Sequence, residues 1–319
     1  MRFTIKQLEY FVAAGEAGSI KLAAEKIAIS QPSISSAISS LESELQLQLF
    51  VRHHARGLSL TSSGRRILLE AKLFLKQGDG LYAIASELNN EIRGQLSVGC
   101  MITLAPMLAP QLAHIFTCDN PGVTVVTTEG GHEEILEMLR QVDIDVAITY
   151  DLPAQDDMCF EALADLPPYI LVSSQHLLAK KSELTLKELE GEPMILLDLP
   201  FSAQYFSSLF ENENLSPCVH TRSRNQDVVR AMVANGYGYT IANVRPKNLT
   251  AMDGRKLKAI RLKGEHKSMK IGIMTLKQTR KPLILTAFES HCRRLISDRK
   301  FPGIFREIGQ IGNWSDLIC

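Results

Sequence analysis

The sequence has few of the features of metal, redox or disulfide-stapled proteins. Its 319 residues include one tryptophan and six cysteines, and no two cysteines form a Cys-x-x-Cys pair. Scattered cysteines in a chain of this length are free thiols by default. We therefore expect no structural disulfide, no metal site and no cofactor. The cysteines are Cys100, Cys118, Cys159, Cys218, Cys292 and Cys319.

Long hydrophobic runs are also missing. No stretch approaches the roughly 18 apolar residues that cross a bilayer. The N-terminal segment carries Lys6 and Glu9, where a secretory signal would be apolar. These two absences predict a cytoplasmic protein with no membrane partner.

The motifs of common catalytic sites are absent as well. The chain has no nucleophile elbow, no phosphate-binding P-loop and no His-Glu-x-x-His zinc motif. Cys100 lies near several hydroxyl residues, but no base and no orienting group can be named for it. We expect no catalytic residues and no enzyme activity.

A net charge of zero hides a local asymmetry in the N-terminal segment. Residues 1–66 contain eight basic and five acidic residues, and residues 52–66 contain no acid at all. In this acid-free stretch Arg52 and Arg56 flank His53 and His54. Such a run is a candidate phosphate-contacting surface, although a solvated face is the alternative.

The spacing of apolar residues predicts how this segment folds. Apolar residues recur at helical intervals before and after a break at residues 15–19, which indicates two short amphipathic helices. The segment Ser30-Gln31-Pro32-Ser33 can cap and begin a third helix. Its exposed face would carry Ser33, Ser35 and Ser36, as a recognition helix does in the major groove. Residues 49–61 predict a short hairpin, or wing, with basic residues at its tip.

These motifs resemble those of the LysR-type transcriptional regulators of bacteria. The resemblance implies a winged helix-turn-helix, with the two central helices at about residues 20–39, that binds promoter DNA. Two positions depart from the family pattern, because many members have a basic residue at Ser36 and glycine at Gln46. The motifs are Ala23-Ala24, Ser30-Gln31-Pro32-Ser33, Leu41-Glu42, Leu49-Phe50, Arg52, Leu60-Thr61 and Gly64. The implied DNA contacts are Ser30, Gln31, Pro32, Ser33, Ser35, Ser36, Arg52 and Arg56.

A long helix is predicted to link this domain to the rest of the chain. Residues 65–92 carry an apolar stripe, interrupted at Gly78 and Gly80. One helix cannot bury such a stripe on itself, so we expect it to pair with the same helix of another subunit. Packing on its own domain is the alternative. The apolar stripe comprises Ile67, Leu68, Ala71, Leu75, Leu81, Ile84, Ala85 and Leu88.

Beyond residue 93 the pattern becomes alternating strands and helices, which is typical of α/β lobes. The family resemblance implies two lobes similar to type 2 periplasmic binding proteins, with the last strand and helix returning to the first lobe. We predict a DNA-binding domain at 1–64, a linker at 65–92 and an effector domain at 93–297. Lobe I would comprise 93–165 and 265–297, and lobe II 166–264. A solute-binding protein of a transporter would have the same lobes, but it would need export.

An effector is expected between the lobes, beyond the carboxyl ends of the strands and near helix N-termini. Converging N-termini suit a small anionic metabolite, and Arg224 would add to that preference if it pointed inward. Capping and packing are the alternative roles for several of these side chains. The candidate effector contacts are Cys100, Met101, Ile102, Thr103, His132, Phe201, Ser202 and Asn225.

Three further expectations follow from the resemblance. It implies a dimer of dimers, with RNA polymerase as a further partner. Some relatives respond to oxidants through two nearby cysteines in lobe II, but only Cys218 lies there, with Cys159 near its border. Small-molecule sensing is therefore favoured over a thiol switch.

Residues 298–319 form an extension, and Phe301, Phe305 and Trp314 indicate packing on the body or on a neighbour, with disorder as the alternative.

Overall fold

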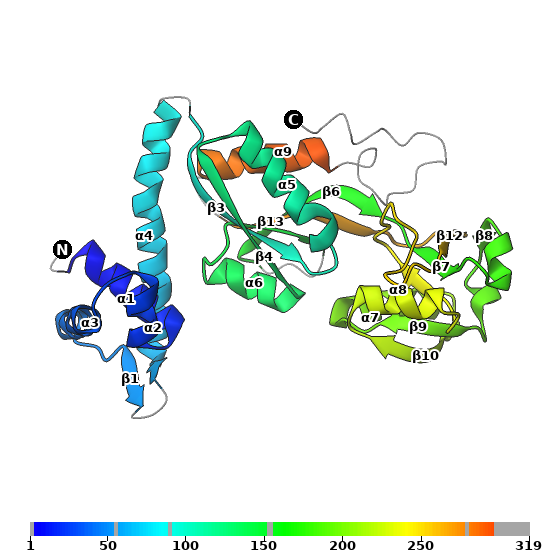
Figure 1. The fold of residues 1–319 in the computed structure, drawn as a ribbon, viewed down its shortest axis with the longest axis horizontal. Coiled ribbons are helices and arrows are strands. Elements are labelled where there is room, and N and C mark those ends of the chain that lie inside the picture. Colours follow the sequence, from blue (N-terminus) through cyan, green and yellow to red (C-terminus); the bar gives the residue numbers. More distant parts are fainter. Residues whose placement is uncertain (1–2, 54–56, 89–90, 152–155, 278–280, 297–319) are drawn as a thin grey trace.

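The computed structural model describes residues 3–53, 57–88, 91–151, 156–277 and 281–296, without the side chains of residues 79–80 and 82–88. The extension at 298–319 therefore lies outside the described residues. Figure 1 shows a helical N-terminal unit at one end, the long helix α4 (Ser62–Leu88) beside it, and an α/β region beyond. Three separate hydrophobic cores accompany this arrangement. Among the described residues, no helix combines the length and apolarity needed to cross a bilayer.

The N-terminal core is enclosed by three helices and a hairpin, as predicted. A hydroxyl group of Thr4, Ser19 or Ser30 caps each helix by accepting a hydrogen bond from the backbone N–H three residues on. Buried apolar residues from all three helices and from the hairpin then pack together. The elements are α1 (Ile5–Ala17), α2 (Ile20–Lys26), α3 (Gln31–Leu45), β1 (Phe50–His53) and β2 (Gly57–Leu60).

The apolar stripe of helix α4 lies in two environments, one buried in the N-terminal core and one exposed. The two glycines interrupt the stripe but not the helix, which continues through Gly78 and Gly80. A helical glycine costs only about 1 kcal/mol relative to alanine, which a helix of this length tolerates. Leu68 and Ala71 are buried in the N-terminal core, whereas Leu81 is 69% exposed. The half of the stripe beside the N-terminal core therefore packs within its own chain.

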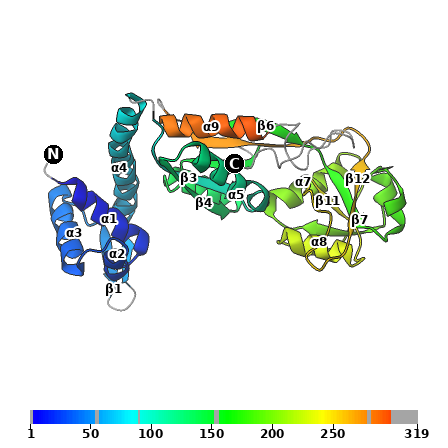
Figure 2. The same ribbon diagram turned by 45° about the horizontal axis from the view of Figure 1, so that its top comes forward.

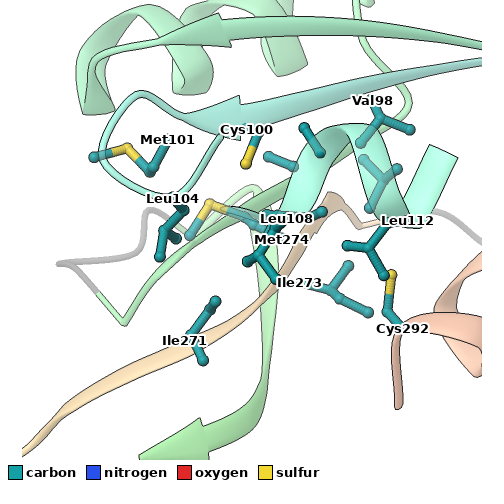
Figure 3. Packing of buried hydrophobic residues seen from close by; sticks show 14 of the residues in the cluster. Val98, Cys100, Met101, Leu104, Leu108, Leu112, Ile271, Ile273, Met274 and Cys292 are labelled. Carbon is teal, nitrogen blue, oxygen red and sulfur yellow. The ribbon is translucent and has the colours of Figure 1, made fainter. Parts of the chain in front are cut away.

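Lobe I is a five-stranded sheet of order β4-β3-β5-β13-β6. Strand β13 pairs antiparallel with both β5 and β6, so the chain returns from lobe II into this sheet, as expected. Figure 3 shows the core where β3, α5 and α9 meet. The elements are β3 (Gly94–Met101), α5 (Ala105–Asp119), β4 (Val123–Gly130), α6 (His132–Arg140), β5 (Val146–Tyr150), β6 (Met158–Leu166), β13 (Met269–Leu276) and α9 (Leu283–Leu295).

Lobe II lies beside lobe I, as Figure 2 shows from a second angle. It contains a sheet of order β11-β7-β12-β8 and the parallel pair β10-β9. Only glycine fits at position 238 after α8, since a Cβ on Gly238 would lie 1.9 Å from the Pro193 carbonyl oxygen. The elements are β7 (Tyr169–Ser173), η1 (Leu177–Lys180), β8 (Glu183–Leu184), η2 (Lys187–Leu189), β9 (Pro193–Leu197), α7 (Pro200–Glu211), β10 (Cys218–Ser223), α8 (Gln226–Ala234), β11 (Thr240–Ala242) and β12 (Leu257–Leu262).

Candidate functional site

The start of α3 forms a polar surface beside the hairpin. Ile34 and Ile38 turn into the core and are nearly fully buried, which leaves the opposite face of the helix to solvent. At the start of the helix, over residues 30–36, this face has small hydroxyl and amide side chains and no acid. Of the six candidate DNA contacts here, Ser35 is half-buried and five are exposed: Ser30, Gln31, Pro32, Ser33 and Ser36.

Two of these serines also hold the helix start. Ser30 Oγ accepts a hydrogen bond from the Ser33 backbone N–H at 3.3 Å and lies 2.7 Å from Ser33 Oγ. Ser30 is therefore the N-cap, and its hydroxyl already has partners in the free protein. Ser36 has no such bond among the described contacts, so its hydroxyl is available to a base edge.

Arg52 connects the hairpin to the recognition surface. It is exposed on β1, and its Nη2 atom donates to Ser35 Oγ at 3.5 Å across 17 residues of sequence. The guanidinium therefore lies beside α3, on the same surface as the hydroxyl groups of that helix. Arg56 and His54, predicted at the hairpin tip, lie outside the described residues.

Several of the quoted motif positions have structural roles. Glu42 Oε1 accepts hydrogen bonds from the backbone N–H groups of Leu49 (2.7 Å) and Phe50 (3.1 Å), which anchors the start of the hairpin. A Cβ on Gly64 would lie 2.1 Å from the Leu49 carbonyl oxygen, so only glycine fits there.

Gln46 ends α3 in the left-handed conformation, with φ of 51°. Glutamine thus occupies a backbone geometry that favours glycine.

The two lobes enclose a cavity at their junction. It holds about 520 Å³ of empty space, including its open mouth. Thr103, Tyr150 and Met269 line it from lobe I, while helices α7 and α8 and strands β7, β9 and β11 line it from lobe II. Thr103 Oγ1 lies 2.7 Å from Tyr150 Oη, which places a pair of hydroxyl groups on one wall. Most of the remaining lining is apolar.

Only Thr103 and Ser202 of the eight candidate effector contacts line this cavity. The Cys100 side chain is fully buried beneath β3 in the lobe I core, with Met101 close to it (Figure 3). Their predicted position at the cleft mouth is therefore corrected, because the alternation of strand side chains turns Cys100 toward α5. Ile102 is 49% exposed and does not line the cavity.

His132 and Phe201 bring the two lobes into contact beside the cavity. Their rings meet edge to face with centroids 4.4 Å apart, His132 from the start of α6 and Phe201 from the start of α7. Burial lowers the pKa of His132, which keeps the imidazole neutral. Its Nδ1 atom is buried without a hydrogen-bond partner in the described structure. Both residues therefore pack against each other across the lobe junction.

Sequence reasoning missed most of the polar residues of the cavity. Tyr150, Gln226, Arg230 and Asn243 all line it. Arg230 lies in the middle of α8 and is only 6% exposed. No motif marks these positions, since a helical arginine is usually a surface residue. Arg224, the basic residue named from the sequence, is exposed and does not line the cavity.

The helix N-termini beside four of the candidate contacts, Thr103, His132, Ser202 and Asn225, differ in which side chains already cap them. Asn225 accepts from the backbone N–H groups of Asp227 and Val228, so it caps α8. Glu134 accepts from the Gly131 N–H and places a carboxylate at the start of α6. By contrast, α5 and α7 have no side-chain cap. An anion would therefore be favoured near Thr103 and Ser202 rather than near His132 and Asn225.

The described cysteines are all free and fall into two groups. Cys118, Cys159 and Cys218 are exposed, while Cys100 and Cys292 are buried in the lobe I core. Burial raises the pKa of Cys100 to about 12 and also raises that of Cys292, so both remain unreactive thiols. Within the described part of the chain no cluster of His, Cys, Asp or Glu side chains could hold a metal ion.

Comparisons with known proteins assign a family to both parts of the chain. Residues 5–65 match the bacterial regulatory helix-turn-helix protein, lysR family, and residues 89–296 match the LysR substrate binding domain. The regulator YvbU of Bacillus subtilis is 30% identical over 239 residues, which is 75% of this chain and 80% of that protein.

Solved structures of full-length regulators have the same fold. HinK, a LysR family transcriptional regulator from Pseudomonas aeruginosa, is 32% identical, with a TM-score of 0.62 over 92% of this chain and 99% of that one. Full-length CbnR, solved in complex with its target DNA, is 26% identical, with a TM-score of 0.55 over 92% and 99% of the two chains. The predicted architecture of helix-turn-helix, linker helix and α/β effector domain is thus confirmed.

Proposed function

The chain belongs to the LysR family of DNA-binding transcriptional regulators, and we propose that it controls promoters in response to a small anionic metabolite bound between its lobes. Members of this family are regulators rather than enzymes. The cavity lined by both lobes carries the proposal, because a ligand there would contact both and favour one closure angle.

We assign promoter recognition to the polar face of α3. Ser33, Ser35 and Ser36 would contact base edges, with Gln31 beside them, and Ser30 with Pro32 would set the start of the helix. Arg52 and Arg56 would contact phosphates. The absence of an arginine on the α3 face suits hydroxyl contacts and DNA shape rather than bidentate reading of guanine. The structure of CbnR with its target DNA supports DNA as the partner.

We place the effector in the cavity between the lobes, in contact with Thr103 and Ser202. Uncapped N-termini of α5 and α7 adjoin these residues and favour an anion. His132 and Phe201 would act beside the ligand, as the contact that changes when the lobes close. The exposed cysteines lie far apart in sequence, which favours this ligand response over a thiol switch.

Self-association is assigned to α4 and to the effector domains. Phe74 and Leu81 are exposed seven residues apart, the spacing of one coiled-coil stripe. Two chains paired through this face would present two recognition helices to a partly palindromic site. Pairing of effector domains would then form a dimer of dimers in the cytoplasm, positioned to contact RNA polymerase.

The domain division follows the elements. We propose a DNA-binding domain at 1–64, a linker at 65–92 and an effector domain at 93–297. A change in lobe closure would alter the spacing of the DNA-binding pairs and hence DNA bending.

A cavity-filling variant tests the proposed function. Ser202→Trp would occupy the space at the start of α7, and Ser216→Trp on the exposed surface is its control. We expect small metabolites to raise Tm and to change the promoter footprint of the wild type and the control, with both effects lost in Ser202→Trp. Equal responses in all three proteins would refute the location of the site.

A further inference from the structure

Among the described residues that line the cavity between the lobes, Arg230 is the only charged one. The other lining residues are hydroxyl, amide or apolar, and none is acidic. A cation that enters would therefore meet a positive charge without a compensating carboxylate. The sign of the cavity charge comes from one side chain, which makes that side chain the natural determinant of ligand charge.

The guanidinium of Arg230 is buried without a counter-charge. Its Nη2 atom donates to the carbonyl oxygens of Asn248 at 2.8 Å and Thr250 at 3.5 Å. No carboxylate appears among its described partners. The two carbonyl groups hold the Arg230 side chain in place, but they do not neutralise its charge. A buried charge without a neutralising acid destabilises the fold unless an anion binds beside it.

Asn243 is a second buried residue of the same cavity, and one of its polar atoms lacks a hydrogen-bond partner among the described residues. Its Nδ2 atom donates to the Leu166 carbonyl oxygen at 2.8 Å and to Tyr205 Oη at 3.2 Å, which fixes the orientation of the amide. Its Oδ1 atom is then buried with no partner in the described structure. A buried acceptor left without a donor is unfavourable, so the ligand should bring an O–H or N–H group.

We infer that the cavity recognises a small carboxylate that also carries a hydroxyl or amino group, such as a hydroxy acid or an amino acid. Arg230 pairs with the carboxylate, and Asn243 Oδ1 accepts from the hydroxyl or amino group. The apolar lining from Leu171, Phe206 and Ile241 takes up the carbon skeleton. This inference rests on the proposed function, and it adds the ligand class and the two residues that select it.

Ligand selectivity, rather than affinity alone, tests the assignment. The full chain is screened by thermal shift with a panel of hydroxy acids and amino acids, their deoxy or deamino analogues and their neutral primary amides, at matched ionic strength. We expect hits among the hydroxy and amino carboxylates. Each should bind about 10–100-fold more tightly than its amide, the range for a charge-assisted hydrogen bond.

Variants separate recognition from structural damage. In Arg230→Met the carboxylate and its amide should bind about equally, so the preference disappears. Arg230→Lys should keep most of the preference because the positive charge is retained. In Asn243→Ala the preference over the deoxy or deamino analogue should fall about 3–10-fold. Arg224→Ala, on the exposed surface of the same lobe, is the control and should keep both preferences.

Three results would overturn the inference. They are hits that lack a carboxylate group, carboxylate preference that persists in Arg230→Met, and no binding by any hydroxy or amino carboxylate of the panel. If compounds without a carboxylate bind and Ser202→Trp abolishes their binding, the effector site stands and only the ligand class is wrong. If hits bind equally to Ser202→Trp, the proposed site itself fails.

Discussion

The Nζ atom of Lys72 lies 2.5 Å from Asp143 Oδ1, and this ion pair joins the linker helix α4 to lobe I of the same chain. Lys72 also lies 3.1 Å from Glu16 Oε1 in α1, so one ammonium group contacts carboxylates of both domains. Lys76 forms a further ion pair with Asp145. The Lys72 side chain is only 10% exposed, which limits screening by solvent at this junction.

Removal of the Lys72 charge should weaken the attachment of lobe I to the DNA-binding domain. We expect Lys72→Met to cost about 1 kcal/mol, a value reduced from that of a buried pair because both carboxylates are partly exposed. Calorimetry should show a lower Tm, with the exposed Lys21→Met as control. An unchanged Tm would mean that the ion pairs contribute no net stability.

The ion pairs of Glu16 with Lys26 and Lys72 predict that the stability of the fold depends on pH. Burial, the largest single influence, raises the pKa of Glu16, but hydrogen bonds and charge interactions with Lys26 and Lys72 together lower it below 4.5. A lowered carboxyl pKa stabilises the fold above its unfolded value and loses that effect as pH falls through the folded pKa. Below pH 4.5 the wild type should therefore lose stability more steeply than Glu16→Gln in urea titrations. Parallel curves would contradict the shift.

Gln46→Gly should stabilise the DNA-binding domain. The left-handed backbone at Gln46 is unfavourable for a residue with a Cβ, and its side chain is exposed, so little packing is lost. We expect a gain of about 0.5–1 kcal/mol, measured as a higher urea midpoint. Gln48→Gly, another exposed position nearby, is the control and should not stabilise. A loss of stability in Gln46→Gly would show that the glutamine side chain has a role of its own.

Arg52→Ala should weaken binding to every DNA sequence. A lost phosphate contact lowers the slope of log K against log salt concentration by about 0.9. Fluorescence anisotropy at several salt concentrations measures this slope. Ser36→Ala serves as the comparison, because it should leave the slope intact and change discrimination among operator variants. The same slope in Arg52→Ala and wild type would remove Arg52 from the phosphate contacts.

Leu81→Glu should disrupt self-association through α4. A charge on this exposed apolar position would disfavour a buried helix pair, and loss of two-site binding should weaken operator affinity at the same time. Analytical ultracentrifugation and gel shift measure the two effects. Met252→Glu, at an 86% exposed position in lobe II, is the control. A variant that stays fully dimeric with normal DNA binding would place the interface elsewhere.

Local sequence determined the DNA-binding domain almost completely. Its helices depend on caps such as Ser30 and on apolar residues at helical spacing, and both act over a few residues. Gly64 is required by a contact with Leu49 only fifteen positions away. The half of the α4 stripe beside the N-terminal core was harder to interpret, since periodicity shows that a face is apolar and not whether Leu68 packs on its own chain or on another.

The lobes themselves could be predicted from alternating strands and helices, but the residues of the cavity could not. Cys100 and Thr103 are three positions apart, and strand alternation together with the turn after β3 sends one into the core and the other into the cavity. Arg230 and Asn243 meet the same space because α8 packs on the strands of lobe II, while Asn243, which follows β11, contacts Leu166 of lobe I. The amino-acid sequence therefore determined the family, the elements and the exposed polar face of α3 through short-range patterns. Tertiary structure alone decided which side chains line the cavity, because that depends on contacts between segments far apart in the chain.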